Sequence, residues 1–193
     1  MRIGFRRVLT VISCLMAIVA SWALPARAGQ AQNCAMVLEP VGPGSEPGAV
    51  EVVPVTLGCF ATYAEALAAG SGGAIQVAAG TTPASLTQHV LDVSSDTLAS
   101  NVLIGTEYDD LNFASSSISY FGTATCSSTV SWQVSYVGDT WNDRFESGKG
   151  FGGCDTNKKF LDSNFGGSVL TCTPNCGGYG SLRNAVSSLK WKP

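Results

Sequence analysis

The sequence predicts a mostly β protein with a small mixed α/β segment on its N-terminal side. From about Val102 onward, short apolar runs alternate with Gly, Ser and Thr, and no helical period is sustained, which is typical of antiparallel strands. The same half contains one pattern of aromatic and turn residues twice. The chain has 193 residues, enough to bury a core, and only 13% are charged, which argues against a coiled coil or a disordered acidic tail.

Residues 1–28 have the three parts of a secretory signal peptide. Arginines near the start give a positive charge, residues 8–24 are uncharged and mostly apolar, and Ala26-Arg27-Ala28 has the small-x-small pattern that precedes cleavage. We expect cleavage after Ala28, a secreted mature protein, and no membrane association after cleavage. The mature chain then divides into residues 29–101, whose role the sequence does not identify, and residues 102–193, the β unit.

The charge of the chain is acidic and unevenly placed. Residues 29–140 contain ten Asp and Glu and no Lys or Arg, whereas all seven bases beyond the signal peptide follow residue 140. Such a chain repels phosphate backbones and attracts cations, so a nucleic-acid partner is excluded. The single His excludes a His-rich zinc site.

Six cysteines follow the signal peptide, and an even number in an exported chain indicates up to three disulfides. Six cysteines allow fifteen pairings, so the sequence does not determine the connectivity. Proximity along the chain favours Cys34–Cys59, Cys126–Cys154 and Cys172–Cys176. A zinc site is disfavoured because Cys172-x-x-x-Cys176 has no second pair at zinc-finger spacing.

The segment 29–101 combines signals of both strands and helices. Pro and Gly indicate a loop, β-branched residues indicate strands, and Ala-rich stretches with Thr caps indicate short helices. In chain order we expect a loop at 38–49, a strand at Val50–Leu57, a helix at Thr62–Ala69, a strand at Ala74–Val77 and a helix at Pro83–Leu91.

An internal repeat occupies the C-terminal half. Tyr108-Asp-Asp-Leu-Asn-Phe113-Ala-Ser115-Ser116 aligns without gaps with Phe160-Leu-Asp-Ser-Asn-Phe165-Gly-Gly167-Ser168 at an offset of 52. The two aromatic rings can pack across a folded hairpin, and Gly supplies a positive φ without steric cost. Ser115 stands where the second copy has Gly167, so either the serine carries a strain of about 1 kcal/mol or the first hairpin is less tightly folded.

A second aligned pair of segments follows the two copies. Trp141-Asn142-Asp143-Arg144-Phe145-Glu146-Ser147 aligns with Leu182-Arg183-Asn184-Ala185-Val186-Ser187-Ser188 at an offset of 41. Together the four segments resemble the βγ-crystallin domain, a double Greek-key sandwich with an aromatic-glycine pattern early and an Asn/Asp-rich loop ending in Ser late in each motif. The resemblance covers residues ~102–193. Export, disulfides and Trp-Asn-Asp are similar to the bacterial secreted metalloproteinase-inhibitor family of that fold.

The resemblance implies a calcium ion between the two late loops. The first site would use Asn142, Asp143 and the carbonyl of Arg144, with Ser187 reaching across from the other loop. Calcium prefers several oxygen ligands in a tolerant geometry, and these residues present only oxygen. The alternative is that the loops are purely structural, because Asn, Asp and Ser satisfy backbone groups in any turn-rich β fold.

A second calcium site is compromised in the resemblance. It would use Asn184, the carbonyl of Ala185 and Glu146, but Arg183 replaces the first Asn/Asp of the loop and places a cation there. Glu146 stands where the family has Ser or Thr, so it is expected either to bind the ion or to pair with Arg183 or Arg144.

These features predict a secreted, non-catalytic binding protein, and the resemblance implies a secreted protease as its partner. The loop Cys172-Thr-Pro-Asn-Cys176 is a candidate contact, although a disulfide-closed hairpin turn is the favoured interpretation of it. No Gly-x-Ser-x-Gly elbow accompanies His89, and the adjacent Asp109 and Asp110 are typical of a solvated turn. The alternatives are a structural or envelope-associated calcium-binding protein without a target, and a sugar-binding module or enzyme acting through residues 29–101.

Overall fold

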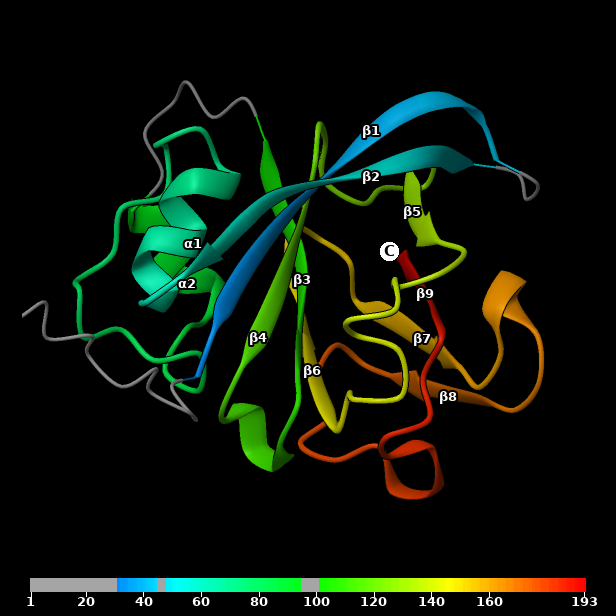
Figure 1. Ribbon diagram of the computed structural model, residues 1–193. Helices are drawn as coiled ribbons and strands as arrows, with labels where there is room; N and C mark the ends of the chain where they lie inside the picture. Colours follow the sequence, from blue (N-terminus) through cyan, green and yellow to red (C-terminus); the bar gives the residue numbers. More distant parts are fainter. Residues whose placement is uncertain (1–30, 45–47, 95–100) are drawn as a thin grey trace, which may run out of the picture.

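The structure is a computed structural model that describes residues 31–44, 48–94 and 101–193 (Figure 1), so the predicted signal peptide lies outside the described residues. Within these described residues, nine strands, two α-helices and three short 3-10 turns follow one another. They are β1 Asn33–Pro43, β2 Ala49–Phe60, α1 Tyr63–Gly70, α2 Gln88–Ser94, β3 Val102–Tyr108, η1 Leu111–Phe113, β4 Ser117–Gly122, β5 Ser131–Val134, β6 Ser147–Gly150, β7 Thr156–Phe160, η2 Ser163–Phe165, β8 Val169–Cys172, η3 Gly180–Leu182 and β9 Ser188–Lys192.

The strands form one curled sheet in the order β6-β3-β4-β1-β2-β5-β9-β7-β8. The two repeats exchange segments within it. Strand β5 follows the first aromatic hairpin but pairs with β9 of the second repeat, and Cys176 of the second repeat bridges Gly148 in β6 of the first. This exchange gives two interlocked Greek keys, which confirms the predicted mostly β, βγ-crystallin-like fold.

The N-terminal hairpin joins the two halves into a continuous sheet. Strand β1 runs parallel to β4 from Asn33 to Val37, and β2 runs parallel to β5 at Ala49 and Val50. In Figure 1 this blue and cyan hairpin crosses over both halves of the molecule. The segment 29–101 therefore supplies two strands to the β unit in addition to its helices.

The predicted loop at 38–49 is wrong for its first half, because β1 continues to Pro43. Two features let a strand pass through these prolines. Beyond Val37, β1 pairs only with β2, so a missing N–H can face an unpaired edge, and the register shifts between Pro40 and Gly42. The predicted strand Val50–Leu57 is confirmed within β2.

The first predicted helix is confirmed, and its start is fixed by a capping box. Thr62 Oγ1 accepts from the N–H of Glu65 at 3.2 Å, and Glu65 Oε2 accepts from the N–H of Thr62 at 2.9 Å. The prediction at Ala74–Val77 is wrong, because these described residues form no strand and Ile75 is instead buried against the helices.

The second predicted helix begins only at Gln88, five residues later than predicted. Lys149 explains the delay. Its Nζ donates to the carbonyls of Pro83 and Ala84 at 3.0 and 2.8 Å and to that of Leu86 at 3.0 Å. A helix starting at Pro83 needs these carbonyls for its own hydrogen bonds, so the ammonium group holds the segment as a turn.

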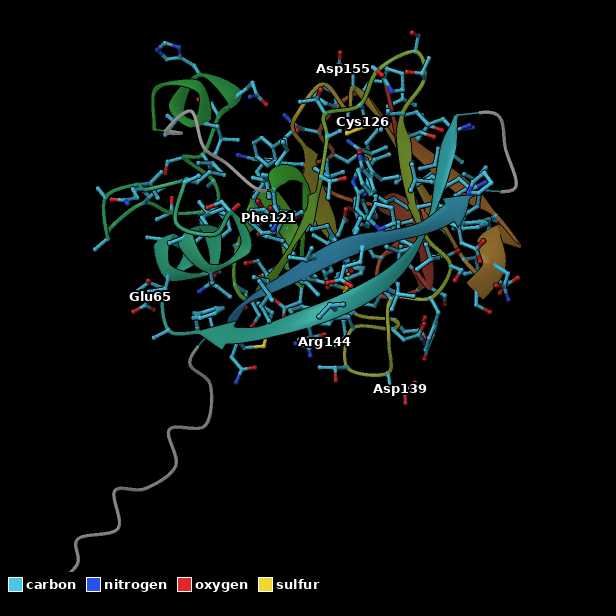
Figure 2. The ribbon with its side chains drawn as sticks, turned by 90° about the horizontal axis from the view of Figure 1, so that it is seen from above. Glu65, Phe121, Cys126, Asp139, Arg144 and Asp155 are labelled. Carbon is cyan, nitrogen blue, oxygen red and sulfur yellow. A yellow bond between two sulfur atoms is a disulfide. The ribbon has the colours of Figure 1, made fainter. Side chains whose placement is uncertain are left out.

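Two hydrophobic cores lie on opposite faces of the sheet. The larger lies inside the curl and includes the fully buried Trp132 and Trp191. The smaller lies between the helices and β1, β3 and β4, and includes Leu67 and Phe121. Figure 2 shows Phe121 between the helical part and the strands. The helices therefore cover the outer face of the first half of the sheet.

Three disulfides link the cysteines in the pairing that proximity favours, Cys34–Cys59, Cys126–Cys154 and Cys172–Cys176. The first connects β1 to the end of β2, so it fixes the register of the hairpin that joins the two halves.

A charged pair lies in the centre of the larger core. Lys159 Nζ of β7 forms an ion pair with Glu107 Oε1 of β3, and the hydroxyl of Tyr179 donates to Glu107 Oε2. Both charged side chains are at most 1% exposed. Burial lowers the pKa of Lys159, and the Glu107 carboxylate opposes that shift. The pair connects corresponding strands of the two repeats.

The repeated aromatic hairpins have the predicted geometry. The ring centroids of Tyr108 and Phe113 are 5.6 Å apart, as are those of Phe160 and Phe165, and both pairs meet edge to face. Ser115 adopts φ 66°, and Gly167 adopts φ 69° at the equivalent position. The serine therefore holds a left-handed conformation that favours glycine.

We predict that Lys159→Met destabilises the protein by about 3–5 kcal/mol, because it leaves the Glu107 carboxylate buried without a counter-ion. Adding Glu107→Gln removes that charge and still accepts from Tyr179, so the double variant recovers most of the loss. Urea unfolding of the three proteins measures both effects. A double variant no more stable than Lys159→Met contradicts the explanation.

We predict that Ser115→Gly stabilises the protein by about 0.5–1 kcal/mol, because it relieves the left-handed serine. The reciprocal change Gly167→Ser destabilises it, since a serine at φ 69° is strained and its Cβ also meets Leu161 Cβ at 3.0 Å. Thermal melting of both variants checks the pair, and equal signs for the two substitutions contradict the assignment.

Candidate metal centre

The two late loops face one another and exchange backbone hydrogen bonds. The N–H of Asp143 donates to the carbonyl of Val186 at 3.3 Å, and the N–H of Asn184 donates to the carbonyl of Phe145 at 3.0 Å. Asp143 and Asn184 both adopt left-handed backbone conformations, with φ 58° and 54°. The structure thus brings the predicted residues of both loops together in a pseudo-twofold arrangement.

Each loop is anchored to the aromatic hairpin of its own repeat. The N–H of Glu146 donates to the carbonyl of Tyr108 at 2.8 Å, and the N–H of Ser187 donates to that of Phe160 at 2.9 Å. Phe145, next to Glu146, is fully buried. These anchors fix where the polar side chains of the loops can lie.

The first donor set contains an unsatisfied oxygen. Asn142 Oδ1 is shielded from solvent and has no hydrogen-bond partner among the described residues. The Nδ2 of the same side chain donates to Asp143 Oδ2 at 2.7 Å, which holds the two side chains together. Ser187, the predicted crossing ligand, is 8% exposed. A buried acceptor without a partner is costly, and a bound cation would satisfy it.

The guanidinium of Arg144 is held away from Asp143 by three other groups. Its Nη2 pairs with Asp109 Oδ2 at 2.8 Å, its Nη1 donates to the carbonyl of Thr140 at 2.9 Å, and it lies 4.8 Å from the ring centroid of Trp141. Sequence reasoning missed this role of Asp109, since 35 residues separate it from Arg144 and no motif joins them. The Asp143 charge forms no ion pair within the described part of the chain.

The first set fits a hard cation such as calcium. It offers one carboxylate, one amide oxygen, a carbonyl and a hydroxyl, and no nitrogen or sulfur donor. No three His, Cys, Asp or Glu side chains of the described residues gather closely enough to hold a metal. The candidate site therefore depends on neutral oxygens around a single acid.

The second set does not fit a cation. Glu146 Oε2 accepts from Arg183 Nε at 2.9 Å and also from Arg183 Nη2, while Glu146 Oε1 accepts from Asn184 Nδ2 at 2.7 Å. Both carboxylate oxygens are occupied and the negative charge is compensated. Of the outcomes expected for Glu146, the structure shows the pair with Arg183.

The loop closed by Cys172–Cys176 is engaged with the rest of the molecule. The carbonyl of Pro174 accepts from the N–H of Gly150 at 3.2 Å and from the Asn157 side chain, and Cys176 exchanges two 3.0 Å backbone bonds with Gly148. These bonds use backbone groups that a protease-binding loop would present to its partner.

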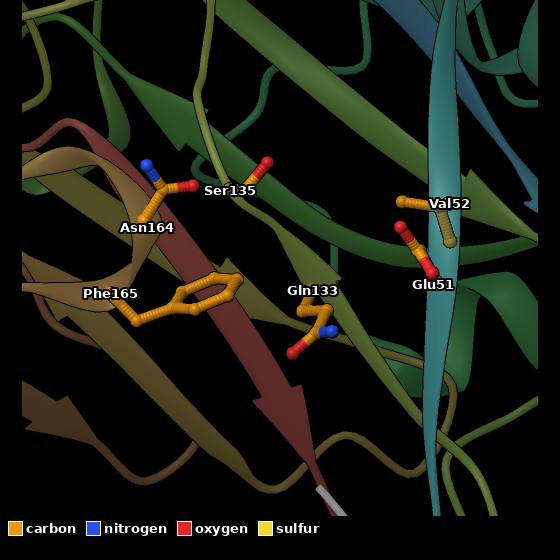
Figure 3. A pocket seen from close by; sticks show the side chains of 6 residues that line it. All are labelled: Glu51, Val52, Gln133, Ser135, Asn164 and Phe165. Atoms are coloured by element: carbon orange, nitrogen blue, oxygen red, sulfur yellow. The ribbon is translucent and has the colours of Figure 1, made fainter. Parts of the chain in front are cut away.

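A small polar groove lies where β2 meets the second repeat. Its lining residues come from three elements, β2, the end of β5 and η2 (Figure 3). They are Glu51, Val52, Gln133, Ser135, Asn164 and Phe165. Gln133 Oε1 is buried and, within the residues that the structure describes, accepts no hydrogen bond. Sequence reasoning missed this groove because its residues belong to no common motif.

The acids that were weighed for catalysis have structural roles. Asp109 Oδ1 accepts from the N–H of Ser116, and Asp110 Oδ1 accepts from the N–H of Leu111, both at 2.7 Å, so both shape the first aromatic hairpin. His89 lies exposed in α2.

No helix of the described residues is long and apolar enough to cross a membrane.

Known structures with similar coordinates are βγ-crystallin domains. They include a βγ-crystallin from an archaeon (22% identity, 47% of this chain and 99% of that chain, TM-score 0.35). A domain from Clostridium beijerinckii matches at 19% identity, over 46% of this chain and 97% of that chain, with TM-score 0.36. A βγ-crystallin from Ciona intestinalis matches at 22% identity, over 46% of this chain and 98% of that chain, with TM-score 0.35. No protein-family model and no curated protein matches the chain.

Proposed function

We propose that this chain is an exported, non-catalytic binding protein that holds one calcium ion between its two late loops. The ligands are the side chains of Asn142 and Asp143, the carbonyl of Arg144, and the hydroxyl of Ser187 from the facing loop. The unsatisfied, enclosed Oδ1 of Asn142 is the observation that carries this proposal. Three disulfides support export, because such bonds persist in oxidising compartments.

The ion would join loops that already touch through their backbones. It would neutralise Asp143 and give Asn142 Oδ1 a partner, so it binds the native state only. Such a ligand stabilises the fold by about 2.7 kcal/mol when the free ion stands at 100 times its Kd. Calcium is therefore a structural ion in this proposal, and the binding surface for a partner lies elsewhere.

Asp143→Ala abolishes the calcium binding that we expect of the wild-type protein, because it removes the only carboxylate of the first donor set. Asn184→Ala, the matched change in the facing loop, leaves it intact. Isothermal calorimetry with calcium chloride measures all three proteins. Heat that persists in Asp143→Ala, or no heat in the wild-type protein, overturns the calcium assignment.

The partner that we propose is a secreted protease, bound as by an inhibitor. Support comes from the rigidity of the scaffold. The disulfides and the charged pair buried in the core hold the protein in one conformation, so that binding costs less conformational entropy. A panel of secreted metalloproteases, assayed with and without a molar excess of the protein, tests this. Full activity of every protease contradicts it and favours a structural calcium-binding protein without a target.

The groove of Figure 3 favours one second candidate, a sugar-binding module. An aromatic ring, two amides, a hydroxyl and the Glu51 carboxylate line it, and these groups bind sugar rings by stacking and hydrogen bonding. Titration with common hexoses, followed by amide chemical shifts, should perturb Ser135 and Asn164 first. Shifts spread over the surface, or none, eliminate this candidate.

A further inference from the structure

The two late loops are equivalent in their backbones and different in their charges. Their N–H to carbonyl exchange and their left-handed residues match in pairs. At the positions where the first donor set has Asn142 and Ser187, the second has Arg183 and Glu146. The two neutral side chains of the first set thus correspond to a cationic and an anionic side chain in the second set.

The replacement places a cation between the loops. The Arg183 guanidinium reaches from one loop to the Glu146 carboxylate of the other through Nε at 2.9 Å and through Nη2. Asn184 Nδ2 adds a third donor at 2.7 Å. The Glu146 side chain is 11% exposed and that of Arg183 is 44% exposed, so this charge-assisted contact is sheltered on the carboxylate side only.

We infer that the Arg183 guanidinium takes the place of a divalent cation in the second loop pair. Guanidinium stays charged throughout the pH range in which proteins fold, so this half is cross-linked whether or not calcium is present. The second loop pair of the wild-type protein therefore binds no calcium. Its oxygens form a latent cation site that opens when the guanidinium is removed.

The chemistry of the exposed donors supports a latent site. Without Arg183, the Glu146 carboxylate keeps the side chain of Asn184 beside it, with Nδ2 at 2.7 Å, and that amide can turn to offer its oxygen. One carboxylate with neutral oxygens matches the donor types of the first set, to which calcium is suited. Arg183→Asn also restores the residue type that the first loop has at Asn142.

The experiment uses Asp143→Ala as its background, so that the outcome does not depend on the first site. Asp143→Ala should bind no calcium, and Asp143→Ala/Arg183→Asn should bind one ion by calorimetry. In chelator, Asp143→Ala/Arg183→Asn should melt at a lower temperature than Asp143→Ala, because its Glu146 has lost the Arg183 partner. Added calcium should reverse that difference in melting temperature. Arg144→Asn in the same background is the control, since its guanidinium pairs with Asp109, and it should gain no ion.

Arg183→Lys separates charge from folding, because it keeps a cation in place with fewer donors. In the Asp143→Ala background it should still bind no calcium and should melt above the Arg183→Asn protein in chelator. The inference is overturned if the Arg183→Asn protein gains no calcium and no calcium-dependent stability. It is also overturned if Asp143→Ala alone binds an ion that Glu146→Gln removes. Failure of the first site alone leaves these outcomes unchanged and contradicts only the proposed function.

Discussion

The reciprocal hydrogen bonds between the two late loops are the constraint on which the rest of the site depends. Because Asp143 bonds to Val186 and Asn184 bonds to Phe145, neither loop can move without the other. The bonds require that the repeats lie side by side in opposite orientation, which the exchange of β5 into the second repeat provides. Local loop geometry and global strand order therefore specify the same arrangement, which is typical of a well-determined fold.

Charge is compensated differently at three places along this pseudo-twofold interface. In the core, Glu107 and Lys159 neutralise each other out of solvent. At the second loop pair, Glu146 and Arg183 do so in a partly exposed position. At the first loop pair, Arg144 pairs with Asp109, and Asp143 forms no ion pair within the described residues. Three of these four acids thus have a basic partner within the protein, and Asp143 has none among the described residues.

The repeated motifs could be predicted because they stand in an aligned repeat. The disulfides follow the pairing that proximity along the chain favoured, although the sequence alone left fifteen pairings open. The expectation that the two late loops meet came from the resemblance that this repeat carries, and the backbone bonds between the loops agree with it. The path of β1 through Pro40 and Pro43 could not be predicted, because it depends on a free sheet edge that only the fold creates.

Long-range contacts decided the features that sequence reasoning missed. The start of α2 depends on Lys149, which lies more than sixty residues further along the chain. Asp143 has no ion-pair partner among the described residues, and the neighbouring Arg144 pairs with Asp109 instead. Neither contact leaves a local pattern in the sequence. The sequence left three outcomes open for Glu146, namely the ion, Arg183 or Arg144, because the contact with Arg183 joins residues 37 positions apart.

A crystal structure of the protein grown with calcium tests the central claim most directly. The account predicts one ion between Asn142, Asp143 and Ser187, and the Arg183 guanidinium still seated on Glu146. An ion on Glu146 with Arg183 displaced, or loops that no longer exchange their backbone bonds, would contradict it.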